Sequence, residues 1–182
     1  MLKKTLQIVA AAALLGPGAA LASEFTVTVD DAVDGSLAPA HFANIMHCTG
    51  KNQSPHIAWK NAPEGTKSFV VTMYDQDAPT GSGWWHWIVT NIPATATDLA
   101  AGAGSGLAAL PKGAVQMNSD GGAPGYGGAC PPVGQTHRYV ISVTAMKVPA
   151  LDLPPTASGA LIGMMTNMNA LAKATLTLKV GR

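Results

Sequence analysis

Five residues with chemically useful side chains lie near the ends of short apolar runs: Asp75, Trp84, His86, His137 and Tyr139. A carboxylate and two imidazoles could exchange protons with a substrate, and together with a phenol they could hold an anion by hydrogen bonds. Because alternate residues of a strand share a face, Trp84 lies with His86 and His137 lies with Tyr139. If the strands are neighbours, these side chains converge at one end of a sheet. Convergence of this kind in a partly apolar pocket predicts a small-ligand site.

The same residues leave an enzyme open as an alternative. Asp75, His86 and His137 could serve a hydrolase or a metal-assisted catalyst. However, the sequence has no HxH or HExxH spacing for a metal and no GxSxG segment for a serine nucleophile. Each residue taken alone also has a structural explanation, because an aspartate before a proline often forms a turn. We therefore expect neither a metal nor another cofactor.

Alternating and β-branched segments predict the strands that must position these side chains. The expected strands are residues 25–29, 56–59, 68–75, 84–92, 137–146 and 175–180. Alternation also places Trp85 and Trp87 together on the face opposite Trp84 and His86.

Residues 158–173 have helical periodicity instead. Leu, Met and Ala side chains recur there at helical spacing, and Thr156 or Ser158 could cap the first turn. We expect the methionines of this stripe to fill the core: Met164, Met165 and Met168. Several strands and one late helix predict a mainly β single domain, residues 23–182, with a peripheral helix.

A long segment dense in Gly, Ala, Pro and Ser covers residues 100–135. A structureless loop of this length inside a compact domain is uncommon and is often functional. Its surface could itself be the active one, as in a secreted protease or kinase-type inhibitor. This inhibitor remains a third hypothesis beside the binding protein and the enzyme.

The N-terminus predicts export. Residues 1–22 combine two lysines, a short apolar run and a small-x-small end, which is typical of a signal peptide cleaved near Ala22–Ser23. The apolar run is too short for a transmembrane span. An oxidising compartment favours a disulfide between the two cysteines, Cys48 and Cys130. We therefore expect the protein in the periplasm or outside the cell.

The composition excludes two further classes. Of the 182 residues, 47% are hydrophobic and 12% are charged, which is not the composition of a disordered chain. The 11 basic and 10 acidic residues include no basic cluster. A nucleic-acid partner is therefore not expected, because binding it needs a basic patch.

Three motifs resemble a known family. Residues 74–87 read YDQDAPTGSGWWHW and closely resemble the YDPDAPTGSGWWHW signature of the phosphatidylethanolamine-binding proteins. Residues 52–59 resemble the NxSPxxxW element of the bacterial YbhB/YbcL branch, also called Raf kinase inhibitor-like. Residues 128–139 resemble its GxxPPxG and HRY elements. The N-terminus and the two cysteines resemble the exported YbcL-type members.

The resemblance implies a β-rich fold with a large central sheet, a smaller sheet and flanking helices. It also implies a preformed pocket for phosphate or the phosphoethanolamine head group. Carried over by motif, the pocket residues are Asp75, Pro79, Trp84, His86, Gly128, His137 and Tyr139. A cis peptide bond before Pro79 and a homodimer are further implications.

Each pocket residue has an expected role. We expect both imidazoles, the Tyr139 hydroxyl and backbone N–H groups near Gly128 to donate hydrogen bonds to an anionic oxygen. Asp75 would accept from an imidazole N–H or hold an ammonium group, and Trp84 would form an apolar wall.

The chain departs from the family pattern at three places. Gln76 replaces a proline of the signature, Cys130 stands where many eukaryotic members have glycine, and residues 175–182 contain no Tyr or Trp. We therefore expect an exported, non-enzymatic protein that binds a small anion and acts through that ligand or a protein partner.

Overall fold

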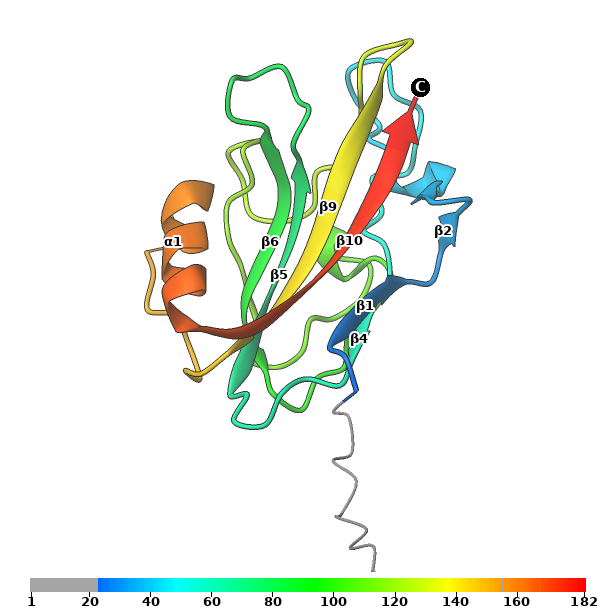
Figure 1. The fold of residues 1–182 in the computed structure, drawn as a ribbon. Coiled ribbons are helices and arrows are strands. Elements are labelled where there is room, and N and C mark those ends of the chain that lie inside the picture. The colour runs from blue at the N-terminus through cyan, green and yellow to red at the C-terminus, as the bar shows by residue number, and fades with distance from the viewer. Residues whose placement is uncertain (1–22, 155) are drawn as a thin grey trace, which may run out of the picture.

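The computed structural model describes residues 23–154 and 156–182, so the expected signal peptide, residues 1–22, lies outside the described residues. A five-stranded antiparallel sheet in the order β10-β9-β5-β6-β8 dominates the fold (Figure 1). Its strands are β5 (Ser68–Asp75), β6 (Trp84–Pro93), β8 (Val115–Gln116), β9 (Thr136–Met146) and β10 (Ala170–Gly181). The central strand β5 is therefore flanked by the two strands that carry the histidines of interest.

A smaller three-stranded sheet packs on one face of the large sheet. Its strands are β1 (Thr26–Val29), β4 (Ile57–Lys60) and β7 (Asp98–Leu99), and a short ribbon of β2 (Ala32–Val33) and β3 (Ser36–Leu37) follows β1. Trp59 of the small sheet packs on Phe69 of the large one, with ring centroids 5.1 Å apart. The main hydrophobic core lies between these two sheets.

The opposite face of the large sheet is covered by α1 (Gly159–Asn169), the single α-helix of the described residues (Figure 1). Ile162 of α1 packs with Ile88 of β6 in a second, smaller cluster. Short 3-10 turns, η1 (Pro39–His41) and η2 (Ala103–Ser105), lie in the connections. No helix in the described ranges has the length and apolarity needed to cross a bilayer.

The mainly β architecture with two sheets and a late helix is confirmed. The expected strand at residues 68–75 has the bounds of β5, and those at 25–29, 84–92 and 137–146 differ from the observed strands by one residue at one end. The strand expected at 56–59 is shifted by one residue at both ends, and that at 175–180 is only the second part of β10. These strands were predictable because their apolar alternation or β-branched content follows directly from burial.

The helix is shorter than expected and part of its apolar stripe faces outward. It begins after Ser158, whose side chain accepts a hydrogen bond from Leu161 N, but it ends at Asn169 instead of residue 173. From Ala170 to Gly181 the chain pairs with β9 instead. These strand hydrogen bonds determine the structure of residues 170–173 despite their helical spacing of apolar side chains. Met164 and Met168 are 53% and 63% exposed, so the prediction that the methionines fill the core was wrong for these two. Met165 is partly buried and packs against the core cluster of Val70, Met146 and Leu151.

A β-bulge in β6 corrects the expected arrangement of the tryptophans. Met73 pairs with Trp87 and Tyr74 pairs with Trp85, so His86 is an extra residue with no partner across from it on β5. A bulge puts neighbouring residues out of simple alternation and often re-aims a side chain beside a site. Trp87 therefore lies in the core between the sheets, whereas Trp85 packs towards α1. The two tryptophans do not share a face.

The Gly-rich segment, residues 100–135, is built into the fold. It contains η2 and β8, and Gly104 N donates to the buried Ser54 hydroxyl at 2.8 Å. A Cβ at Gly104 would lie 2.5 Å from the Trp87 ring, so the chain passes that ring too closely for any other residue. The segment consequently forms one wall of the cavity described next.

Candidate functional site

A cavity of about 540 Å³ opens at one end of the large sheet. All seven residues predicted from the motifs line it: Asp75, Pro79, Trp84, His86, Gly128, His137 and Tyr139. They come from the end of β5, the start of β6, the start of β9 and two loops. Antiparallel pairing explains the convergence, because Asp75 lies opposite Trp84 on one side and Tyr139 on the other.

The deepest polar contact of the site joins Asp75 and His137. Asp75 Oδ2 lies 2.7 Å from His137 Nδ1, and both side chains are almost completely buried. The other carboxylate oxygen, Oδ1, accepts from Asp77 N at 2.9 Å. His137 Nε2 lies 3.1 Å from Gln135 Oε1. The carboxylate therefore orients the imidazole, as expected, and is itself held by the turn that follows β5.

Tyr139 lies beside this pair, and its ring packs at a tilt of 45° against His86. The His86 and Tyr139 ring centroids are 5.0 Å apart. Burial raises the pKa of the Tyr139 hydroxyl, and the neighbouring Asp75 carboxylate raises it further. The hydroxyl consequently keeps its proton at physiological pH and remains a hydrogen-bond donor.

His86 has a different hydrogen-bonding state from the one that the motifs implied. Its Nδ1 donates to the Gly127 carbonyl oxygen at 2.8 Å. Burial lowers the pKa of His86, and the Gly127 carbonyl, Asp75 and Asp120 oppose this shift only in part. A neutral ring with its hydrogen on Nδ1 offers a lone pair at Nε2. In the free protein at neutral pH, His86 therefore offers an acceptor to a ligand and not the expected donor.

Gly128 lines the cavity, but its N–H group is already bonded. Gly128 N donates to Asn52 Oδ1 at 2.7 Å, and Gly127 N donates to the His86 carbonyl oxygen at 2.8 Å. The expectation that these backbone groups donate to an anion was wrong for the free protein. A glycine is required here for packing instead, since a Cβ would lie 2.4 Å from Ala43 N and 2.6 Å from the Phe42 carbonyl carbon.

Gly128→Ala is therefore expected to lower the free energy of unfolding by about 1–3 kcal/mol, because the clash is with backbone that cannot rotate away. Urea unfolding followed by tryptophan fluorescence measures the change. Gly127→Ala is the matched control, since a Cβ there meets His86 O at an ordinary 3.7 Å. Equal midpoints for the two variants would contradict this account of Gly128.

The turn after β5 places Pro79 at the cavity wall without a cis bond. All peptide bonds of the described residues are trans, so the implied cis bond before Pro79 was wrong. The turn is fixed by side chains instead: Asp75 accepts from Asp77 N, and Thr80 Oγ1 donates to Gly83 O at 2.5 Å. Asp77 is paired with Arg138, whose guanidinium lowers the pKa of the Asp77 carboxyl to about 2.

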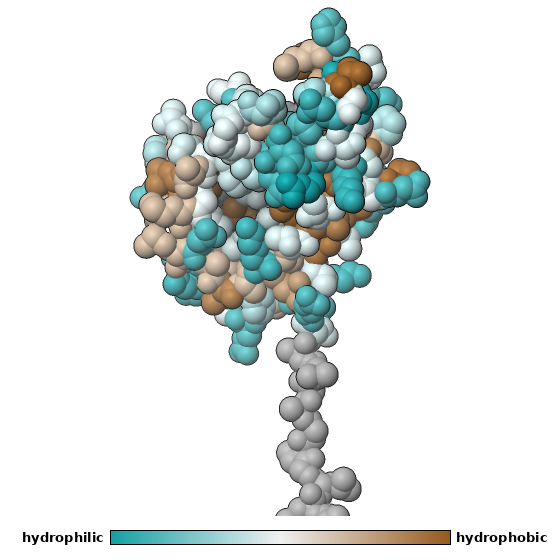
Figure 2. Space-filling view, turned by 45° about the horizontal axis from the view of Figure 1, so that its top comes forward, coloured by the Kyte–Doolittle hydropathy of each residue, from teal (hydrophilic) through white to brown (hydrophobic). Residues whose placement is uncertain are grey.

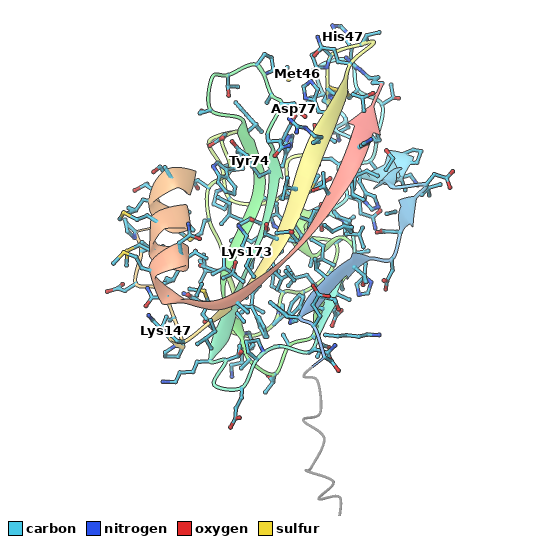
Figure 3. All side chains as sticks on the ribbon, viewed as in Figure 1. Met46, His47, Tyr74, Asp77, Lys147 and Lys173 are labelled. Atoms are coloured by element: carbon cyan, nitrogen blue, oxygen red, sulfur yellow. A yellow bond between two sulfur atoms is a disulfide. The ribbon has the colours of Figure 1, made fainter. Side chains whose placement is uncertain are left out.

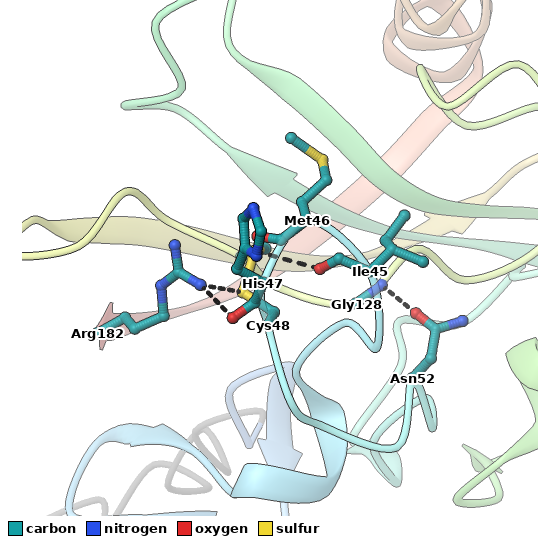
Figure 4. Close-up of a disulfide and its surroundings, with 8 residues drawn as sticks. Ile45, Met46, His47, Cys48, Asn52, Gly128 and Arg182 are labelled. Atoms are coloured by element: carbon teal, nitrogen blue, oxygen red, sulfur yellow. Dashed lines mark hydrogen bonds between the residues drawn. A yellow bond between two sulfur atoms is a disulfide. The ribbon is translucent and has the colours of Figure 1, made fainter.

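A disulfide lies beside the mouth of the cavity. Cys48 and Cys130 are bonded, with their Cα atoms 5.9 Å apart, and Arg182 Nη1 donates to Cys48 Sγ and to His47 O (Figure 4). The bond fastens the loop of residues 44–50 to Cys130, which lines the cavity. Figure 3 shows Met46 and His47 at the upper end of the sheet.

The rim of this mouth is partly apolar. Ile45 and Met46 line it and are 65% and 74% exposed, and Val133 of the neighbouring loop is also exposed. In Figure 2, brown and teal side chains lie side by side at the top of the molecule. Neither Ile45 nor Met46 was predicted as a site residue, because an isolated Ile-Met pair in a loop carries no sequence signal.

Asn52 was also missed as a cavity residue. Its segment, residues 52–59, carries one of the motifs that resemble the family, but asparagine itself has no predicted role there. A lone asparagine in a left-handed conformation usually forms a turn, and its contact with residues 126–128 becomes visible only in three dimensions. Within the described ranges, no cluster of three or more His, Cys, Asp or Glu side chains could hold a metal ion.

A comparison with protein families matches the model described as phosphatidylethanolamine-binding protein over residues 20–181. The UPF0098 protein YbhB of Escherichia coli K12 is 50% identical over 149 residues, which cover 81% of this chain and 94% of that one. The Mycobacterium tuberculosis protein named putative lipoprotein LppC is 35% identical over 140 residues, covering 76% of this chain and 63% of that one.

A solved structure has the same fold. The crystal structure of Escherichia coli YbcL, described as a new member of the mammalian PEBP family, superposes with a TM-score of 0.83 and 47% identity. The superposition covers 88% of this chain and 99% of that one. Because the superposed residues make up nearly the whole described chain, they include both sheets and the residues around the cavity.

Proposed function

Because the chain belongs to the phosphatidylethanolamine-binding protein family, we propose that it is an exported binding protein that takes a phosphate-type group, either inorganic phosphate or phosphoethanolamine, into this cavity. The observation that carries the proposal is the set of buried polar groups of Asp75, His86, His137 and Tyr139 around one cavity of about 540 Å³. Buried polar groups that face a cavity are stabilised by a ligand with matching hydrogen bonds.

The hydrogen bonds of the two histidines support binding rather than catalysis. His137 contacts Asp75 and Gln135, and His86 contacts the Gly127 carbonyl oxygen. In the described part of the chain, neither imidazole is hydrogen-bonded to a Ser, Thr or Cys side chain that could act as a nucleophile. The hydrolase alternative, which uses Asp75, His86 and His137, gains no support from this arrangement.

Binding of an oxyanion next to His86 requires that the imidazole be protonated at Nε2. In the free protein the ring is neutral, because burial lowers its pKa, and its Nε2 lone pair would repel an anionic oxygen. Protonation at Nε2 turns this repulsion into a charge-assisted hydrogen bond. Asp75 and Asp120 are the charged groups that favour the protonated ring, and the neutral Tyr139 covers one ring face.

We expect anion affinity to increase as the pH falls. The anion raises the pKa of His86 in the complex above its lowered value in the free protein, so binding takes up a proton between these two values. Affinity then decreases by up to about tenfold for each pH unit as the pH rises through this window. Sulfate is the probe for this test because, unlike phosphate, it does not itself take up a proton in the range from about pH 6 to pH 8.

Isothermal titration calorimetry of the purified protein with sulfate, phosphate and phosphoethanolamine measures the affinity and the number of protons taken up. His86→Ala should weaken sulfate binding by at least about tenfold and abolish its proton uptake. His56→Ala is the matched control, since His56 lies between Asp30 and Asp98 of the small-sheet region, away from the cavity. An absence of saturable heat with all three ligands would overturn the proposed function.

Export is the second part of the proposal. The Cys48–Cys130 disulfide supports an oxidising compartment, and one relative carries the name lipoprotein. We place the protein in the periplasm or outside the cell, with residues 1–22 removed near Ala22–Ser23. A homodimer and a protein partner stay predictions.

A further inference from the structure

Asn52 binds the backbone of the cavity wall through both ends of its side-chain amide. Asn52 Oδ1 accepts from Gly128 N at 2.7 Å, and Asn52 Nδ2 donates to Tyr126 O at 3.4 Å (Figure 4 shows the first bond). The residue between these two anchor points is Gly127. A single side chain therefore holds the backbone on both sides of Gly127.

Gly127 is in turn the residue that contacts His86. Its N–H donates to the His86 carbonyl oxygen at 2.8 Å, and its own carbonyl oxygen accepts from His86 Nδ1 at 2.8 Å. The orientation of this carbonyl depends on the peptide plane between Gly127 and Gly128. Asn52 fixes that plane, because it accepts the N–H group on the other side of the same peptide bond.

Asn52 is itself held rigidly by two other segments. Asn52 N donates to Phe42 O at 2.8 Å, and Asn52 O accepts from the Ser105 hydroxyl at 2.7 Å. Its φ of 51° lies in the left-handed region, which asparagine tolerates far better than most residues. The amide is thus preorganised before any ligand arrives.

We propose that Asn52 is a positioning residue that holds the Gly127 carbonyl against His86 and thereby keeps the imidazole hydrogen on Nδ1 and the lone pair on Nε2. The part of a ligand next to Nε2 must then carry a hydrogen, such as the hydroxyl of a protonated phosphate monoester, or bring a proton with it. A phosphodiester, which has no such hydroxyl, must rely on a proton from solvent. The statements about the ligand rest on the proposed function, whereas the positioning role of Asn52 does not.

The tautomer is measured directly in the ligand-free protein by NMR of ¹⁵N-labelled histidine. At a pH above the titration of His86, the wild-type full chain should show a single Nδ1–H form. Asn52→Gly keeps the left-handed backbone and removes only the amide, so the Nε2–H form should become populated to at least about a tenth. The same variant should take up fewer protons when it binds sulfate, because the Nε2–H form donates to the anion without a proton from solvent.

Asn91 offers a closely matched control. Its φ is 57°, its Oδ1 accepts from Leu151 N at 2.8 Å, and its Nδ2 donates to Leu151 O at 3.4 Å, at the far end of β6. Asn91→Gly removes an equivalent pair of backbone hydrogen bonds, so it should cost similar stability and leave both the His86 tautomer and the proton uptake on sulfate binding unchanged.

Three outcomes distinguish the proposals. A wild-type His86 spectrum in Asn52→Gly overturns the positioning role, whether or not sulfate binds. A changed tautomer without sulfate binding by the wild type supports the role and contradicts the proposed function. If Asn52→Gly does not fold, Asn52→Asp replaces it, because it keeps the acceptor for Gly128 N and loses only the donor to Tyr126 O. The Nδ1–H form should then persist, and a mixture of tautomers in this variant would overturn the role of Oδ1.

Discussion

Asp75→Ala is expected to abolish anion binding and to lower the free energy of unfolding by about 3–5 kcal/mol. Asp75 is 2% exposed and lies 2.7 Å from the equally buried His137. Removal of the carboxylate leaves the buried His137 Nδ1 without its acceptor. It also frees Asp77 N, so the turn that carries Pro79 to the cavity loses its anchor.

Calorimetry with sulfate and urea unfolding measure the two effects of Asp75→Ala. Asp77→Ala is the matched control, because this aspartate lies two residues further on and pairs with the half-exposed Arg138, where solvent screens the interaction. Its midpoint should change much less. If Asp75→Ala is too unstable to titrate, the isosteric Asp75→Asn is used, and wild-type sulfate affinity in either variant would contradict the role of this carboxylate.

Replacement of both cysteines in Cys48→Ser/Cys130→Ser is expected to lower the free energy of unfolding by up to about 4.5 kcal/mol. The bond joins residues 82 positions apart, and its loss lets the unfolded chain explore many more conformations. In the folded state the loop of residues 44–50 loses its covalent tie to Cys130 at the cavity mouth. We therefore also expect a several-fold weaker affinity for sulfate.

Urea unfolding of this double variant and of the wild type, each with and without dithiothreitol, tests the stability effect. The reductant should lower the wild-type midpoint to that of the variant and leave the variant itself unchanged. An identical midpoint for both proteins without reductant would show that the bond does not contribute in solution.

Much of the site was predictable because it lies at strand ends. The alternation in residues 68–75 and 137–146 gives both the strand bounds and the faces, and antiparallel pairing then brings Asp75 next to Tyr139. The motif resemblance added residues that alternation cannot find, such as Pro79 and Gly128, because they lie in loops. Both residues could be predicted because each belongs to a motif of consecutive residues.

The errors have a different origin, since each depends on contacts between distant segments. Ala170 leaves the helix because it pairs with Met146, and Gly128 N–H is unavailable because Asn52, 76 residues earlier in the chain, has taken it. The face of Trp87 depends on a bulge that no alternation pattern contains. Local sequence patterns cannot predict which backbone groups will be hydrogen-bonded to residues that are distant in the chain.

Because of the bulge in β6, the site and the sheet can change independently in evolution. His86 is the one residue of this stretch that the ladder with β5 does not pair, so a substitution there alters what the cavity recognises while the register of the sheet stays intact. Deletion of His86 would remove the bulge together with the imidazole and would make Trp85 and Trp87 neighbours in one continuous alternation. New ligand preferences can therefore arise at this position by point substitution without any change in the pairing of β5 with β6.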